Sequence, residues 1–90
     1  MKNILLISLN AELEAKMAVI LQPQGISLTR IDSPEKAKIF LIENHSRFNL
    51  AMFDAELAKG AGLDILLELK DIYPALPFIT ATALEPETKS

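Results

Sequence analysis

The sequence predicts an α/β domain built on a parallel sheet, and two features of its 90 residues support this prediction. Short apolar runs alternate along the chain with longer segments in which apolar residues recur at helical spacing. Nearly continuous apolar runs are typical of strands that are covered on both faces, as they are in parallel sheets. Strand and helix alternate until a fourth strand is reached, and this order implies right-handed crossovers between parallel strands.

The first predicted strand covers residues 3–9, and the first helix follows it directly. Asn10 is a suitable N-cap for this helix, because its side chain can accept a hydrogen bond from the first turn. The helix is expected to end at Pro23 and Gly25. Its buried side is expected to consist of Leu13, Met17, Ile20 and Leu21. The second strand then covers residues 26–31.

Ser33 followed by Pro34 marks the start of the second helix, since serine is a favoured N-cap and proline suits the first helical position. The helix should end at the polar residues 44–47. Its buried side is expected to consist of Ala37, Phe40 and Leu41. The third strand covers residues 48–53 and leads into Asp54. Open α/β sheets bind ligands beyond the carboxyl ends of their strands, so Asp54 is the leading candidate for a functional residue.

The third helix is expected over residues 63–73 and the fourth strand over residues 78–83, with Pro77 in the turn between them. The inward side of this helix is expected to consist of Leu66, Leu69 and Tyr73. Residues 1–84 should therefore form one domain, and residues 85–90 a polar C-terminal tail.

The composition argues against several classes of function. With no cysteine and a single histidine, His45, the chain can form neither a disulfide nor a thiolate or multi-histidine metal site. The net charge is −3 and the nine Lys and Arg residues are dispersed, which argues against direct nucleic-acid binding. The longest apolar run near the N-terminus, residues 4–7, is too short to span a membrane. A soluble, cytoplasmic protein is therefore expected.

Several segments together resemble the response regulator receiver domains of two-component signalling. Residues 48–54 (FNLAMFD) are similar to the family's YDLVLLD, and residues 77–83 (PFITATA) to PVIMLTA. Shorter matches are Gly25-Ile26 with GY, residues 33–37 (SPEKA) with DGEEA, and Gly62-Leu63 with GL. The resemblance implies a flavodoxin-like, three-layer α/β/α fold with strand order 2-1-3-4. The family's fifth strand and last helix are expected to be missing from the chain.

The resemblance also implies roles for individual residues. Asp54 falls on the phosphoryl-accepting aspartate, and Thr82 on the hydroxyl residue that hydrogen-bonds the phosphoryl group in the family. The family's two magnesium-binding acids at the end of the first strand are replaced by Ser8 and Leu9. The backbone carbonyl of Glu56 falls where the ion site would be completed. Because magnesium needs anionic oxygen ligands, Asp54 alone is expected to hold it poorly.

The sequence is compatible with two functions. The favoured one is a pseudo-receiver: a signalling or dimerisation module that is not an enzyme, needs no cofactor and is not efficiently phosphorylated. A second copy or another protein is expected to bind through the fourth strand and the adjoining helix, because an exposed strand edge recruits partners. The alternative is a phosphorylation-dependent receiver with bound Mg²⁺, in which Asp54 accepts a phosphoryl group from a sensor histidine kinase and controls an attached effector domain.

Two further alternatives concern the loops next to the strand ends. Asn10 or Glu12 could replace the lost acids, although a helix cap and a first-turn acid explain these two residues better. Gly60-Ala61-Gly62 is similar to part of a dinucleotide-binding glycine loop. The last glycine of that motif would be Ile65, however, which argues against a dinucleotide site.

Overall fold

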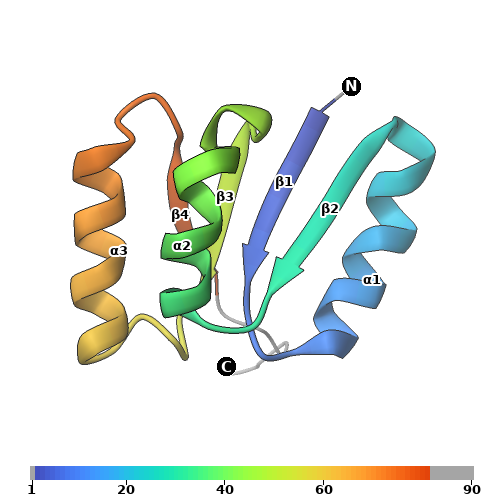
Figure 1. Ribbon diagram of the computed structural model, residues 1–90. Helices are drawn as coiled ribbons and strands as arrows, with labels where there is room; N and C mark the ends of the chain where they lie inside the picture. The colour runs from blue at the N-terminus through green and yellow to red at the C-terminus, as the bar shows by residue number, and fades with distance from the viewer. Residues whose placement is uncertain (1, 82–90) are drawn as a thin grey trace.

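The computed structural model describes residues 2–81, which fold into a parallel sheet flanked by helices (Figure 1). The strands are β1 (Lys2–Ile7), β2 (Ile26–Ile31), β3 (Leu50–Asp54) and β4 (Phe78–Ala81). The helices are α1 (Ala11–Leu21), α2 (Pro34–Asn44) and α3 (Ala61–Ile72). Short 3-10 turns follow the first two helices, at Gln22–Gln24 and His45–Arg47.

The strands lie in the order β2-β1-β3-β4, and every neighbouring pair is parallel. The predicted strand order and fold class are therefore confirmed. Arg30 and Ile31 show how the layers are arranged: Arg30 reaches Glu14 of α1, whereas Ile31 packs against the core that contains α2 and α3 residues. Because successive side chains of a strand point to opposite faces, α1 covers one face of the sheet and α2 and α3 cover the other.

The main core lies between the sheet and the inner sides of α2 and α3. Its buried side chains are Leu5, Ile7, Ala37, Leu41, Phe48, Ala51, Phe53, Leu66, Leu69, Leu76 and Phe78. Phe40 and Tyr73, both expected to point inward, are partly buried at its margin. This core holds β1 against β3, so that Ile7 lies level with Phe53 and the two strands end side by side.

Both predicted helix caps are present. Oδ1 of Asn10 accepts a hydrogen bond of 2.9 Å from the N–H of Leu13, and Oγ of Ser33 accepts one of 3.1 Å from the N–H of Lys36. Each cap satisfies an N–H group that the first helical turn leaves without a partner. The cap at Asn10 also fixes the start of α1 immediately after the end of β1.

Three element boundaries differ by two residues from the sequence prediction. The first strand ends at Ile7 because the chain turns there toward α1. The third strand begins at Leu50 because residues 45–47 take up a 3-10 turn before it. The third helix begins at Ala61, two residues earlier than predicted, because Gly60, at a φ of 54°, has already turned the chain.

Helix α1 is less buried than its sequence predicts. None of its residues, all of which the structure describes, is fully buried, and Ile20 is exposed although it was expected to point inward. The other predicted inward residues, Leu13, Met17 and Leu21, are partly buried. The physical reason is position: α1 packs mainly against β2, the strand at the rim of the sheet.

The predicted fourth strand is observed as β4, which the structure describes as far as Ala81. Thr82, Ala83 and the predicted tail, residues 85–90, lie outside the described residues. Within residues 2–81, no helix combines the length and the apolar character needed to cross a bilayer.

Candidate functional site at Asp54

Ser8 and Asp54 meet where β1 and β3 end. They follow Ile7 and Phe53, which lie level in the parallel pair, so both side chains project from the same end and face of the sheet. The Ser8 hydroxyl donates a hydrogen bond of 2.7 Å to Oδ2 of Asp54. The exposed fraction is 0% for Ser8 and 4% for Asp54, so this contact is shielded from water.

Ser8 uses each of its hydrogen-bonding groups. Its N–H donates to the carbonyl oxygen of Ile31 at 2.9 Å, and its own carbonyl oxygen accepts from Nη1 of Arg30 at 3.0 Å. Its hydroxyl oxygen accepts from the backbone N–H of Asn10 at 3.0 Å while the hydroxyl donates to Asp54. A buried network whose members are all satisfied is rigid. Ser8 therefore ties the ends of β1, β2 and β3 to the start of α1.

The second carboxylate oxygen of Asp54 is occupied as well. Oδ1 accepts a hydrogen bond of 2.9 Å from the backbone N–H of Glu56, a local turn that aspartate side chains commonly form. The backbone carbonyl oxygen of Asp54 accepts from the N–H groups of Leu57 and Ala58. Each carboxylate oxygen of Asp54 thus binds a donor from the chain itself, one from each of the two neighbouring loops.

The side chains of Leu9 and Glu56, which were also singled out from the sequence, are exposed. Leu9 is 69% exposed, and its alkyl side chain offers no ligand atom. The Glu56 side chain is exposed and lies 3.3 Å from Nζ of Lys59, so only the backbone of Glu56 contacts Asp54. Thr82 lies outside the described residues.

A magnesium ion fits poorly among these side chains. Mg²⁺ requires a near-octahedral set of oxygen ligands and is usually held by carboxylates and water. Across residues 2–81, no three or more Asp, Glu, His or Cys side chains gather in a way that could hold a metal ion. Ser8 directs its proton at the Asp54 carboxylate. This hydrogen bond connects the ends of β1 and β3.

Arg30 is the functional candidate that the sequence prediction missed. It lies at the end of β2, where Nε forms an ion pair of 2.8 Å with Oε1 of Glu14 and Nη1 binds the Ser8 carbonyl. The available signal was a single charged residue within the otherwise uncharged segment 26–31. Its contact with Ser8 could not be foreseen, because it depends on how β1 and β2 are aligned.

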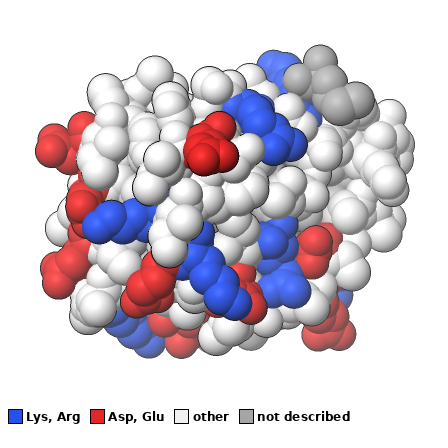
Figure 2. Space-filling view, in the orientation of Figure 1, with Lys and Arg blue, Asp and Glu red and all other residues white. Residues whose placement is uncertain are grey.

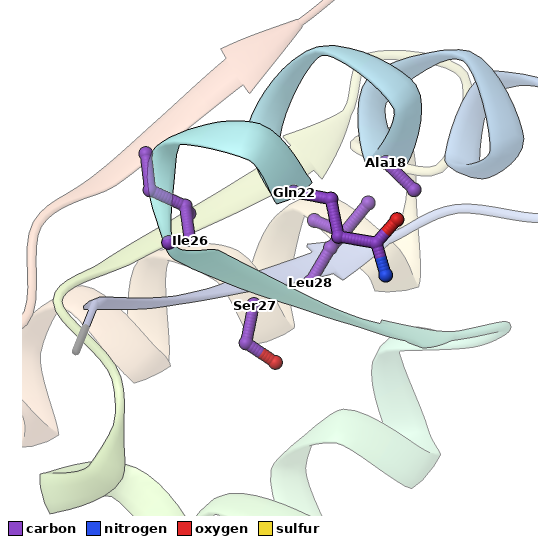
Figure 3. Close-up of a pocket in the computed structure, with 6 residues that line it drawn as sticks. Ala18, Gln22, Ile26, Ser27 and Leu28 are labelled. Atoms are coloured by element: carbon purple, nitrogen blue, oxygen red, sulfur yellow. The ribbon is translucent and has the colours of Figure 1, made fainter.

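Two depressions flank β2, and neither is formed by Asp54. One, of about 370 Å³, lies at the carboxyl end of the strand and is lined by Arg30, Ile31, Asp32, Lys36 and Phe40. The other, of about 320 Å³, lies between the end of α1 and the opposite end of β2 (Figure 3). The six described residues that line it carry no charge: Ala18, Gln22, Gly25, Ile26, Ser27 and Leu28. The second depression is thus remote from the strand ends where Asp54 lies.

Charges of both signs are mixed on the molecular surface. On the face shown in Figure 2, Lys and Arg side chains lie between Asp and Glu side chains over the described residues. Ion pairs join Lys36 to Asp32 at 3.2 Å and Lys38 to Glu68 at 3.0 Å. Such pairing reduces the local positive potential that a phosphate backbone would need.

The fold is similar to that of solved receiver domains. A response regulator receiver domain protein from Clostridium thermocellum has a TM-score of 0.76 and 24% identity, covering 91% of this chain and 65% of that chain. The MaeR response regulator bound to beryllium trifluoride gives 0.73 and 23%, covering 96% and 70%. The N-terminal domain of a response regulator/sensory box/GGDEF three-domain protein from Carboxydothermus hydrogenoformans gives 0.71 and 26%, covering 98% and 70%.

These structural similarities show that the chain has the receiver-domain fold, as the sequence resemblance implied. The chain spans between 65% and 70% of the length of these three chains. No family model matches the sequence, and no curated protein does.

Proposed function

We propose that the protein is a receiver-type signalling module in which Asp54 acts as a structural residue and phosphoryl transfer is inefficient. The observation that carries this proposal is the buried hydrogen bond of 2.7 Å from Ser8 to Asp54. The serine stands where the resemblance would place a magnesium-binding acid, and it offers a donor instead of a negative charge. The module would then signal through contacts with other proteins and not through catalysis.

Electrostatics supports the same conclusion. Transfer of a phosphoryl group to a carboxylate brings together groups of like charge, and metal ions or cationic side chains must neutralise that charge. Asp54 has hydrogen-bond donors on both oxygens, but both donors are neutral, and within residues 2–81 its carboxylate forms no ion pair. Arg30 reaches the site only indirectly, through the backbone carbonyl of Ser8, and its guanidinium already pairs with Glu14. An incoming phosphoryl group would have to displace donors without gaining a compensating positive charge.

For the interaction surface we favour self-association through β4 and α3. Within residues 2–81, β4 lies at the end of the sheet and pairs only with β3, so its other edge has unpaired backbone groups. Leu63 and Leu67 are exposed one turn apart on α3, and Ile79 of β4 is exposed on the opposite face of the sheet, because its neighbour Phe78 points into the core shared with α3. Exposed strand edges next to apolar side chains favour association with another chain. A second copy of the chain is the partner proposed here.

The second candidate function is a phosphorylatable receiver. It is favoured by the position of Asp54, buried at the carboxyl end of β3. A similar structure, MaeR, binds beryllium trifluoride, and another similar structure is the N-terminal part of a three-domain protein. In this alternative a histidine kinase would supply the phosphoryl group, Mg²⁺ would assist its transfer, and an attached domain would carry the output.

Incubation with Mg²⁺ and acetyl phosphate distinguishes the two functions, with intact-protein mass as the readout. If the protein is a pseudo-receiver, neither the wild type nor Asp54→Asn should gain the mass of a phosphoryl group. A phosphoryl adduct on the wild type that is absent from Asp54→Asn would overturn the proposal and establish the phosphorylatable receiver.

A further inference from the structure

The guanidinium group of Arg30 joins three elements at the functional end of the sheet. From β2, Nε contacts Oε1 of Glu14 in the first turn of α1 at 2.8 Å, and Nη1 contacts the backbone oxygen of Ser8 at 3.0 Å. The side chains of Arg30 and Glu14 are 24% and 36% exposed, whereas Ser8 is fully buried. The ion pair therefore reaches the surface, while the serine that it contacts does not.

The hydrogen bonds of Ser8 make Arg30 important for the direction of the serine side chain. The N–H of Ser8 is fixed on β2 by Ile31, and its carbonyl oxygen is fixed by Arg30. With both sides of the backbone held, the side chain is directed at Oδ2 of Asp54. Without Arg30 the buried carbonyl oxygen of Ser8 would lose the guanidinium as its donor. The loop after β1 would then have to move to bring this oxygen to another donor.

We propose that Arg30 is the positioning residue of the Asp54 site. Acting through Ser8, it holds the serine hydroxyl on the carboxylate, and Glu14 in turn holds the guanidinium in place. This inference deepens the proposed function and rests on it, because it names what keeps Asp54 hydrogen-bonded to the chain. It makes the hydrogen bond between Ser8 and Asp54 depend on the ion pair between Arg30 and Glu14 at the surface. The resemblance to receiver domains does not imply this dependence.

The shape of the guanidinium is essential to this role. Arginine presents several N–H donors in a rigid planar fork, whereas the lysine ammonium is a compact point charge on a flexible stem. Arg30→Lys keeps the charge but should not bind Glu14 and the Ser8 carbonyl together in this geometry. A positioning role therefore predicts a loss in Arg30→Lys, and a role based on charge alone does not.

The test is the ¹³C signal of the Asp54 side-chain carboxyl group by NMR, recorded in the intact chain without metal or phosphoryl donor. Ser8→Ala removes the hydroxyl and defines the signal of the uncapped carboxylate. Arg30→Met should move the Asp54 signal most of the way from its wild-type position to its position in Ser8→Ala. The signals of Arg30→Lys and Glu14→Gln should lie between those of the wild type and Arg30→Met. Lys36→Met is the matched control, because it breaks a neighbouring ion pair, with Asp32, and should leave the signal unchanged.

Amide hydrogen exchange provides the second readout. The N–H of Asn10 donates to Ser8 Oγ, and its exchange should become about tenfold faster in Arg30→Met, while core amides of β1 keep their wild-type rates. If Arg30→Met fails to fold, Arg30→Lys and Glu14→Gln decide the question. Wild-type carboxyl signals in all folded Arg30 and Glu14 variants, beside a shifted signal in Ser8→Ala, would overturn the inference. Labelling of the wild type by acetyl phosphate would overturn the proposed function, and the NMR result would still report whether Arg30 positions Ser8.

Discussion

The hydroxyl of Ser8 lies 2.7 Å from a carboxylate oxygen of Asp54, although the two residues are 46 positions apart in the chain. The contact joins the ends of two neighbouring parallel strands inside a shielded site. A serine hydroxyl thus donates to Asp54 from the position where the resemblance to receiver domains would place a carboxylate. The properties of the site should therefore follow from this hydrogen bond, and they can be tested by substitution.

Ser8→Ala should destabilise the protein. It removes a donor to the buried Asp54 carboxylate and the acceptor of the Asn10 N–H, so the free energy of unfolding should fall by about 1–3 kcal/mol. Urea unfolding followed by circular dichroism measures the change. The matched control is Ser27→Ala on the exposed part of β2, which should cost less than about 0.5 kcal/mol. Equal losses in the two variants would contradict a special role for Ser8.

Replacing Ser8 and Leu9 together by aspartate should create a magnesium-dependent protein. Without metal, the new carboxylate beside Asp54 repels it and lowers the melting temperature. Mg²⁺ should restore stability, by about 2.7 kcal/mol at a concentration about 100-fold above its dissociation constant. The wild type should respond little to the same Mg²⁺ concentration in a thermal melt.

The matched control for this double substitution is Ser8→Asn with Leu9→Asn, which has nearly the same shape without the charge. A magnesium response as large in the asparagine variant as in the aspartate variant would show that the missing acids are not what limits metal binding.

Gly62→Ala should destabilise the start of α3. In a helix interior alanine is ordinarily favoured over glycine by roughly 0.8–1.0 kcal/mol. Here a Cβ on residue 62 would overlap the carbonyl oxygen of Leu57, so the sign should reverse, with a net loss of about 1–3 kcal/mol in urea unfolding.

Gly25 provides the comparison for Gly62. It has a φ of 76° and a ψ of 21°, in the left-handed region, and open space where a Cβ would lie, so only its backbone conformation disfavours a side chain. Asparagine tolerates that conformation better than alanine does. Gly25→Asn should therefore retain more stability than Gly25→Ala, whereas Gly62→Asn should be no better than Gly62→Ala. An increase in stability in Gly62→Ala would show that the loop around Leu57 can move to make room for the added Cβ at little energetic cost.

Leu67→Glu and Ile79→Glu should weaken self-association. Each replaces an exposed apolar side chain, one on α3 and one on β4, by a charge, and the dimer dissociation constant should rise by about tenfold or more. Light scattering over a range of protein concentrations measures this constant. Ile39→Glu, on the exposed side of α2, is the control and should leave it unchanged. A monodisperse wild-type monomer at high concentration would rule out this surface as a dimer interface.

Local sequence features predicted most of the fold. Asn10 and Ser33 cap helices as expected, because capping depends on residues three positions away. The alternation of apolar runs with helical patterns predicted the parallel sheet, and the resemblance to receiver domains predicted its strand order. Helix α1 was predicted less well, because the exposure of Ile20 depends on where the helix sits on the sheet.

The sequence alone predicts a carboxylate at the end of the third strand, and the resemblance to receiver domains places Ser8 and Leu9 at the positions of two acids. Three features became visible in the folded chain alone: Ser8 turns its hydroxyl onto Asp54, Leu9 faces solvent, and Arg30 of β2 donates to the Ser8 carbonyl. The physical reason is that these contacts depend on the alignment of separate strands. That alignment is set by packing across the whole core and not by neighbouring residues in the chain.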